Sequence, residues 1–192
     1  MLLPYTRLSR YRSWAGLRSD RAAEIAETAV ILPALFMLLL SIYWFGRAYT
    51  VYGAINHAAR EGAQTAAVPA CANCNGGCTW QSSSLPCDSV VVQAVNNSML
   101  AANLDPTQAV PSTPNPTPEP CPNVVPEGVC TQASGGQFTI CRNMVLNQGT
   151  ASPPVCGVII SFQYPYQFVL PFTSLNNQRI LLKAQVEMRG ED

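Results

Sequence analysis

The residues in this chain whose types and spacing best suit chemistry are its cysteines. All eight follow residue 70, and they are Cys71, Cys74, Cys78, Cys87, Cys121, Cys130, Cys141 and Cys156. The first four are close enough in sequence to bind zinc or an iron–sulfur cluster. The first two, separated by Ala72 and Asn73, also have the spacing of a redox-active dithiol. Metal binding and thiol redox chemistry are therefore two alternatives to structural disulfides.

The surroundings of these cysteines favour disulfide bonds. Their flanks lack the strand-to-helix pattern of a redox fold, and Asn75 stands where a haem-attachment motif has histidine. An even number of cysteines, confined to the part of the chain after an apolar segment, is typical of an exported, oxidising compartment. We expect all eight to form disulfides, with no metal and no cofactor. Eight cysteines allow about 105 pairings, and the sequence does not choose among them.

No catalytic group of residues is evident. His57 is the only histidine, so a nucleophile–histidine pair would have to use it. Acidic residues are sparse, and there is no glycine-rich phosphate loop. We expect His57 to be a helix-surface residue and the protein not to be an enzyme.

These residues follow a long apolar segment. Residues 28–45 contain 18 consecutive positions without a charge, enough to cross a bilayer as a helix at ~1.5 Å per residue. Arg47 interrupts this run, but apolar or small residues continue at steps of three or four: Ala48, Val51, Ile55, Ala58, Gly62 and Ala66. The spacing predicts one helix over residues 23–67 that leaves the membrane and continues as a stalk.

Charges near the apolar segment predict its orientation. Residues 1–21 hold five arginines against a single acid, Asp20: Arg7, Arg10, Arg12, Arg18 and Arg21. Positive charge is retained on the cytoplasmic side, so the N-terminus should lie inside and the cysteine-rich part outside the cytoplasmic membrane. A cleaved secretory signal is the alternative, but its apolar region would be only about 7–15 residues.

The net charge is zero, and no lysine or arginine lies between Arg60 and Arg142, which excludes a basic surface for nucleic acid there.

The middle of the chain predicts a second helix and a loop. A short amphipathic helix over residues 90–103, capped by Asp88 or Ser89, places four residues on one face: Val91, Val95, Met99 and Ala102. Residues 106–126 hold half of the 16 prolines. We expect this proline-rich segment to be an exposed, extended loop, because it cannot form a helix or a strand ladder.

The last part of the chain predicts an antiparallel sheet. Alternating apolar residues indicate strands over 138–145, 156–164 and 180–188, and Cys141 and Cys156 fall on strands that should be adjacent. The second helix and the stalk could cover the apolar face of this sheet. The expected fold is α+β: a basic leader (1–22), a transmembrane and stalk helix (23–67), and a small disulfide-rich domain (68–192) with the proline-rich loop at 106–126.

The helix carries a family resemblance. Glu27, Ala29 and Pro33 are followed, after the apolar segment, by the sequence Ala58, Ala59, Arg60, Glu61, Gly62 and Ala63. With these residues, the region 20–67 resembles the TadE-like proteins, minor pilin-like components of the tight-adherence pilus. Residues 161–166 and 184–189 show a weaker resemblance to the closing strands of that family.

The resemblance implies a membrane-anchored minor pilin-like protein with a pilin-like fold. It would pack through its helix against other pilin-like subunits and the pilus assembly machinery at the cytoplasmic membrane. It also implies leader removal by a prepilin peptidase, between Ala22 and Ala23, although Ala22 stands where the family usually has glycine. Glu27 would then meet the new amino terminus of its own or a neighbouring chain. The residues alone allow a simpler role for Glu24 and Glu27, at the positive end of the helix dipole.

Two further features bear on assembly. Pro33 should bend the helix or delay its start, because it lacks a backbone donor and clashes with the preceding turn. Five small residues would let another helix approach closely: Gly46, Gly53, Ala54, Ala58 and Ala59.

An alternative function is a single-pass, extracytoplasmic binding module unrelated to pili, whose proline-rich loop and disulfide domain contact a ligand. An anchored thiol oxidoreductase is a third.

Overall fold

The computed structural model describes residues 20–68, 85–125, 127–133, 135–150, 153–167 and 179–190, with side chains from residue 25 onward. The leader arginines up to Arg18 and three of the cysteines, Cys71, Cys74 and Cys78, lie outside the described residues. The chain divides into two compact units, Met1–Phe45 and Gly46–Asp192, and each is described by itself.

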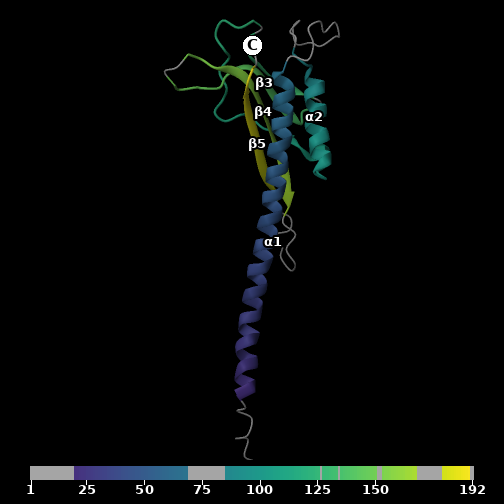
Figure 1. Cartoon of the computed structure of the whole chain (residues 1–192), viewed down its shortest axis with the longest axis vertical. Helices are drawn as coiled ribbons and strands as arrows, with labels where there is room; N and C mark the ends of the chain where they lie inside the picture. The colour runs from purple at the N-terminus through teal and green to yellow at the C-terminus, as the bar shows by residue number, and fades with distance from the viewer. Residues whose placement is uncertain are drawn as a thin grey trace, which may run out of the picture. The chain divides into compact units, whose positions relative to one another are not determined.

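The first element is one long helix, α1 (Asp20–Ala67), which contributes to both units (Figure 1). The helix is continuous past Arg47, which confirms that the apolar run and the stalk form one element. Its residues 25–45 lie in the first unit and its residues 46–67 in the second.

The second unit contains the rest of the described structure. After α1 come α2 (Asp88–Ala101), a short 3₁₀ helix η1 (Pro106–Gln108), and five strands: β1 (Val110–Pro111), β2 (Val129–Ala133), β3 (Phe138–Val145), β4 (Cys156–Gln167) and β5 (Arg179–Arg189). The strands of this unit form one antiparallel sheet, so the predicted α+β class with a helix-packed antiparallel sheet is confirmed.

Strand β4 lies at the centre of the sheet. Along one edge it pairs with β5 over eleven residues, from Gly157↔Arg189 to Gln167↔Arg179. The other edge is shared: β3 pairs with the first half of β4, and the two-residue β1 pairs with Phe162 and Gln163. Strand β2 then pairs with β3 and ends the sheet. The three strands predicted from alternation are β3, β4 and β5, whereas β1 and β2 are additions.

The main core lies between the sheet and the helices of this unit. Val158, Ile160 and Phe162, at alternate positions of β4, face the helices and pack with buried residues of α1 and α2. Phe162 also makes an edge-to-face contact with Phe138 of β3, with ring centroids 5.1 Å apart. The period-two pattern read from the sequence therefore does correspond to a helix-covered face.

A bulge in β3 changes which face its residues occupy. The register moves from Cys141↔Ile159 to Met144↔Gly157, so two residues, Arg142 and Asn143, oppose Val158. Asn143 has φ 54°, a left-handed conformation that asparagine tolerates better than most residues. Beyond the bulge, Met144 joins Cys141 and Ile159 in a small second cluster.

The proline-rich segment is wrongly predicted in part. It forms a helical turn (η1), a strand pair (β1) and a bridge between Pro120 and Met144, and it packs on the sheet. Buried Ser161 of β4 donates to the Ser112 carbonyl at 2.6 Å. The Gln185 side-chain amide of β5 accepts from the Asn115 backbone N–H through Oε1 and donates to the Asn115 carbonyl through Nε2. The prolines leave most backbone groups unpaired within the segment, and side chains of the sheet satisfy several of them.

Disulfides join the proline-rich segment to the sheet and two strands of the sheet to each other. Cys121, at the end of the proline-rich segment, pairs with Cys156 of β4, and Cys130 of β2 pairs with Cys141, which lies opposite it on β3. Cys87 is disulfide-bonded as well, and none of the described cysteines is free. Cys141 and Cys156 do lie on adjacent strands, as expected, but they bond to other partners.

Helix α2 differs from its prediction at both ends. Cys87, not Asp88 or Ser89, is the N-cap, and it makes no side-chain capping bond. The Asp88 carboxylate is instead used by Arg142, as described below. Val91, Val95 and Met99 are buried as predicted, but Ala102 is exposed, because it follows the last helical residue, Ala101.

Candidate functional site

The apolar half of α1, residues 25–45, is the first part of the candidate site. Its side chains are exposed or half-buried, including large ones such as Ile31, Phe36 and Met37. In the part of the chain that the structure describes, α1 is the one helix long and apolar enough to cross a membrane, with a mean hydropathy of 2.2. Such a surface is unfavourable in water, so this helix suggests a membrane anchor.

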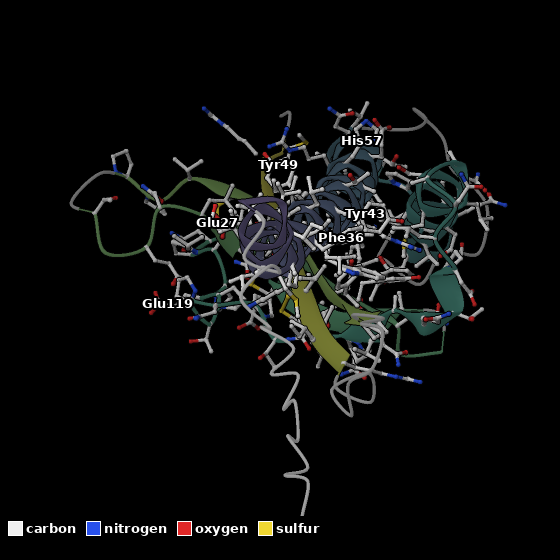
Figure 2. All side chains as sticks on the ribbon, turned by 90° about the horizontal axis from the view of Figure 1, so that it is seen from below. Glu27, Phe36, Tyr43, Tyr49, His57 and Glu119 are labelled. Carbon is white, nitrogen blue, oxygen red and sulfur yellow. A yellow bond between two sulfur atoms is a disulfide. The ribbon has the colours of Figure 1, made fainter. Side chains whose placement is uncertain are left out.

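Glu27 lies near the start of this apolar half. Its side chain projects outward from α1 (Figure 2) and forms no hydrogen bond or ion pair with any side chain that the structure describes. A carboxylate is costly next to hydrocarbon unless it is paired or reaches the interface. The geometry therefore leaves Glu27 available for a cationic partner outside the described residues.

Pro33 lies within the helix. The helix begins at Asp20, so the expectation that it forms only after Pro33 is wrong, and the backbone remains helical across this residue. Because proline has no N–H, the Ala29 carbonyl four residues earlier receives no helical hydrogen bond from it. A shallow hollow lies beside that carbonyl, lined by Ile25, Thr28, Ala29 and Leu32. This stretch of α1 thus combines a shallow, mostly apolar surface with a backbone acceptor.

The family-signature residues lie in the second unit and are used for internal packing. Ala58, Ala59 and Ala63 are fully buried, and Gly62 is buried with them. A side-chain carbon at Gly62 would overlap Val95 Cγ2 of α2 and come within 3.0 Å of Ile160 Cδ1 of β4. Glycine is therefore needed where α1 passes closest to both α2 and the sheet.

The polar members of the signature face outward. Arg60 is exposed, and Glu61 is half-buried, with its Oε1 atom 3.7 Å from His57 Nε2. The signature thus consists of a small-residue face that packs and a charged face that meets solvent. This is the arrangement of an amphipathic helix.

The small residues predicted to admit another helix therefore fall into two groups. Ala58 and Ala59 already pack within the chain. At Gly46 and Gly53, by contrast, an added carbon would meet no described atom within 4 Å. These two glycines are seven residues apart, about two helical turns, so they lie on one face of α1. They remain open for a close approach by another chain.

Sequence reasoning missed a buried arginine that joins three elements. Arg142, in the bulge of β3, is 1% exposed and donates from Nη2 to Asp88 Oδ1 at 2.9 Å and to the Pro86 carbonyl at 2.8 Å. Its Nη1 atom donates to the carbonyl of Ala66, in the last turn of α1, at 3.3 Å. Asp88 Oδ2 accepts a further bond, from Thr131 Oγ1, at 2.8 Å.

This arginine fixes the end of α1 to the start of α2 and to the sheet. A cation at a helix C-terminus and an anion in the first turn of a helix both complement the helix dipoles. One signal could have revealed it. Arg142 is the first cation after an 81-residue stretch without one, and it follows the strongly apolar start of a predicted strand, where only a paired charge is tolerated.

His57 links the two helices of the second unit. It lies on the side of α1 next to α2 (Figure 2), where its Nδ1 atom is 3.3 Å from Ser98 Oγ. Together with Glu61, these are the residue types of a catalytic triad. The His57 and Glu61 side chains are, however, 69% and 47% exposed, so this row lies open to water instead of in a water-excluding cleft.

Metal binding finds no support in the cysteines that can be placed. Cys121, Cys130, Cys141 and Cys156 are all held in disulfides. Among the residues that the structure describes, no group of three or more histidine, cysteine or acidic side chains is arranged to hold a metal ion. The first cysteines of the chain, Cys71 to Cys78, lie outside that part.

The comparisons with known proteins agree with the resemblance seen in the helix. Residues 22–64 match the family described as TadE-like protein. The match begins at Ala22, the residue before the expected cleavage point, and it includes Glu27, Pro33 and the whole signature through Ala63. The weaker resemblances at 161–166 and 184–189 lie outside it. No curated protein and no solved structure is significantly similar to the chain.

Proposed function

We propose that this protein is a membrane-anchored, pilin-like component of a tight-adherence pilus, and that it assembles with other pilin-like subunits through α1. The observation that carries this proposal is that the family match covers both parts of α1. The residues that match the TadE-like family, 22–64, contain both the exposed apolar half of α1 and the signature that packs the rest of the helix into its own unit.

Anchorage follows from the apolar half. Residues 25–45 expose a continuous apolar surface that lipid would cover. The arginines of the leader favour an N-terminus inside the cytoplasmic membrane. The disulfides of the second unit favour an oxidising compartment, which places that unit outside. Charge and cysteine chemistry thus agree on one orientation.

Assembly would use residues of α1 that lie outside the core of the second unit. Glu27 would pair with the amino terminus created by leader removal at Ala22, on its own chain or a neighbour's, because the two charges are costly in lipid when they are apart. The shallow, mostly apolar surface around Ala29 and the open faces of Gly46 and Gly53 would admit neighbouring helices. Each of these contacts can form without disturbing the core of the second unit.

This division of α1 suits a subunit that moves from lipid into a filament. The residues that bury Ile55, Ala58 and Ala63 all belong to the second unit, so a change in what surrounds residues 25–45 would leave that core in place. The apolar half can therefore exchange lipid for protein neighbours while the second unit stays folded.

The test compares Glu27→Gln with Glu61→Gln in cells that make the pilus, and measures the protein in sheared pilus fractions and in membranes. We expect Glu27→Gln to remain in the membrane and to be lost from pili, while Glu61→Gln is incorporated normally. Amino-terminal sequencing of the extracted protein should find Ala23 first. A first residue of Met1 would exclude processing but not anchorage, and normal incorporation of Glu27→Gln would refute the assembly role of that carboxylate.

A binding module is a second candidate, and one cavity favours it. A hollow of about 330 Å³ lies between the proline-rich segment and the strands, lined by residues including Ser112, Thr117, Gln132 and Thr139. Ser112 Oγ is buried and has no hydrogen-bond partner. An uncharged polar ligand would fit these groups. A chain that is absent from pilus fractions but still present in the membrane would favour this second function.

A further inference from the structure

The second unit has a distinct end, near Gly46, which we call the basal end. Helix α2 runs antiparallel to α1: Val91 and Val95 approach Gly62, whereas Ser98 contacts His57, earlier in α1. The C-terminus of α2 therefore points toward Gly46.

Strand β5 also begins at the basal end. Its last residue, Arg189, and Gly190 after it line one cavity together with Ala66 and Ala67, at the end of α1. Figure 1 likewise shows β5 running alongside α1. Eleven residues of β5 span about 33 Å. The 22 residues of α1 in this unit rise by nearly the same distance, about 33 Å. Arg179 and Ile180 therefore lie within a few turns of the point where α1 enters the unit.

The start of β5 is apolar on both faces. Residues 179–189 alternate between apolar and polar except at Leu181, which falls on the polar side together with Lys183 and Gln185. Successive strand residues point to opposite faces, so Ile180 and Leu181 present apolar side chains in two directions. They are 47% and 52% exposed. Water does not favour such an arrangement, but an apolar surrounding at this end of the strand does.

Aromatic and basic residues accompany these side chains. Tyr49 and Tyr52 are exposed on the first turns of α1 in this unit. Arg47 and Arg179 are exposed at the same end. Tyrosine and arginine beside aliphatic residues are typical of protein that meets the headgroups of a bilayer, because each combines an apolar body with a polar tip.

We propose that the basal end rests on the phospholipid surface, with Ile180 and Leu181 in the headgroup region and Arg179 near lipid phosphates. The inference depends on the proposed anchorage, because the charge-free run of α1 ends just before Arg47, and this unit begins at Gly46. Because this unit follows the lipid-embedded part of the helix directly in the chain, lipid is the occupant that we expect on its basal end. Arg47 and Tyr49 follow the apolar segment within about one turn of helix, so this end of the unit begins where the anchor leaves the lipid.

The test uses the full chain in vesicles of phosphatidylethanolamine and phosphatidylglycerol. The photoreactive amino acid p-benzoylphenylalanine replaces one residue at a time, and mass spectrometry identifies what it captures after illumination. Ile180 and Leu181 are the test positions. Val129 of β2 is the matched control, because it is also an exposed strand residue (45%) but pairs with Arg142, whose side chain binds the far end of α1. Phe36 reports anchorage itself.

We expect lipid adducts at Ile180, Leu181 and Phe36, and none at Val129. An adduct at Phe36 without one at either β5 position would overturn this inference and leave the anchorage intact. The absence of an adduct at Phe36 would refute the anchorage instead. Capture of protein at Ile180 and Leu181 would show that a neighbouring subunit, not lipid, covers the basal end. Two test positions protect the result against a folding defect at one of them, which non-reducing electrophoresis of the disulfides would detect.

Discussion

The two halves of α1 use the same kind of residue in opposite ways. Residues 25–45 are apolar and stay exposed or half-buried, with Ile42 61% exposed, whereas residues 46–67 bury Ile55 completely against α2 and the sheet. The difference lies in size and spacing. Large side chains all around the helix stay exposed in the first half, whereas alanines and Gly62 along one face let the second half pack closely. A continuous helix can thus carry one surface for its environment and another for its own fold.

The largest effect should come from the residue that holds the end of the second half. Arg142→Met removes the donors to Asp88 Oδ1 and to the carbonyls of Ala66 and Pro86 and leaves the Asp88 charge without its cation. It should lower the free energy of unfolding by about 3 kcal/mol. Urea unfolding of the full chain in detergent, with disulfides intact, measures it. The control Arg60→Met removes an exposed arginine of α1 and should change stability by less than about 0.5 kcal/mol. Equal losses in the two variants would mean that the Arg142 contacts contribute little.

A matched isoleucine pair tests the comparison most directly. Ile55→Ala removes a fully buried side chain and should cost about 2–4 kcal/mol, through lost burial and the cavity that remains. Ile42→Ala makes the same change in the exposed half and should leave the unfolding of the second unit unchanged within about 0.5 kcal/mol. Circular dichroism during urea unfolding in detergent distinguishes them. If Ile42→Ala were as costly, the two halves would not be energetically separate.

A pair of glycine substitutions tests how closely the second half of α1 is packed on its two sides. Gly62→Ala introduces a carbon that overlaps Val95 Cγ2, and the overpacking should cost about 1–3 kcal/mol, partly offset by the higher helix propensity of alanine. Gly53→Ala meets open space and should stabilise the helix by about 0.5–1 kcal/mol. Opposite signs in thermal unfolding are expected. A stabilising Gly62→Ala would show that Val95 and Ile160 can move aside.

Much of this fold follows from local patterns. The continuous α1, the buried positions of α2, and strands β3, β4 and β5 each carry a clear period of 3.6 or 2 in the sequence, and each forms. The family signature was likewise readable, although its packing role was not. The sequence alone suggests that Ala58 and Ala59 pack against a helix of another subunit, whereas α2 and the sheet of the same chain already cover that face.

What could not be predicted depends on contacts between distant segments. Strand β2 is a short edge strand with mostly exposed residues, so it lacks an apolar alternation of its own. The two placed disulfides depend on the register of β2 with β3 and on the path of the proline-rich segment to β4. Likewise, no local pattern marks the bulge at Asn143, which turns Met144 to the other face of the sheet. Arg142 stays in phase with Phe138 and Ile140 on the helix-covered face, and only its contacts with α1 and α2 show that its charge is paired there.

The smallest expected effect concerns a carboxylate at the join between α2 and the proline-rich segment. The hydroxyl of Thr107, which donates to Asp105 Oδ1 at 2.7 Å, and then the Thr107 backbone N–H hold the pKa of Asp105 below its ordinary value of 3.8. Because this pKa is lowered by folding, the ionised group stabilises the folded chain above the ordinary value, and that contribution is lost as the pH falls through the folded pKa.

Thr107→Val removes the hydroxyl donor but keeps the backbone N–H, so the pKa of Asp105 should rise part of the way toward 3.8. Titration of the side-chain carboxyl carbon by NMR measures this shift. Thr117→Val, an exposed threonine of the same segment, should leave the pKa unchanged. An unchanged pKa in Thr107→Val would mean that the backbone N–H alone is responsible. The shift should be the same in detergent and in lipid vesicles, because Asp105 and both donors from Thr107 belong to the second unit.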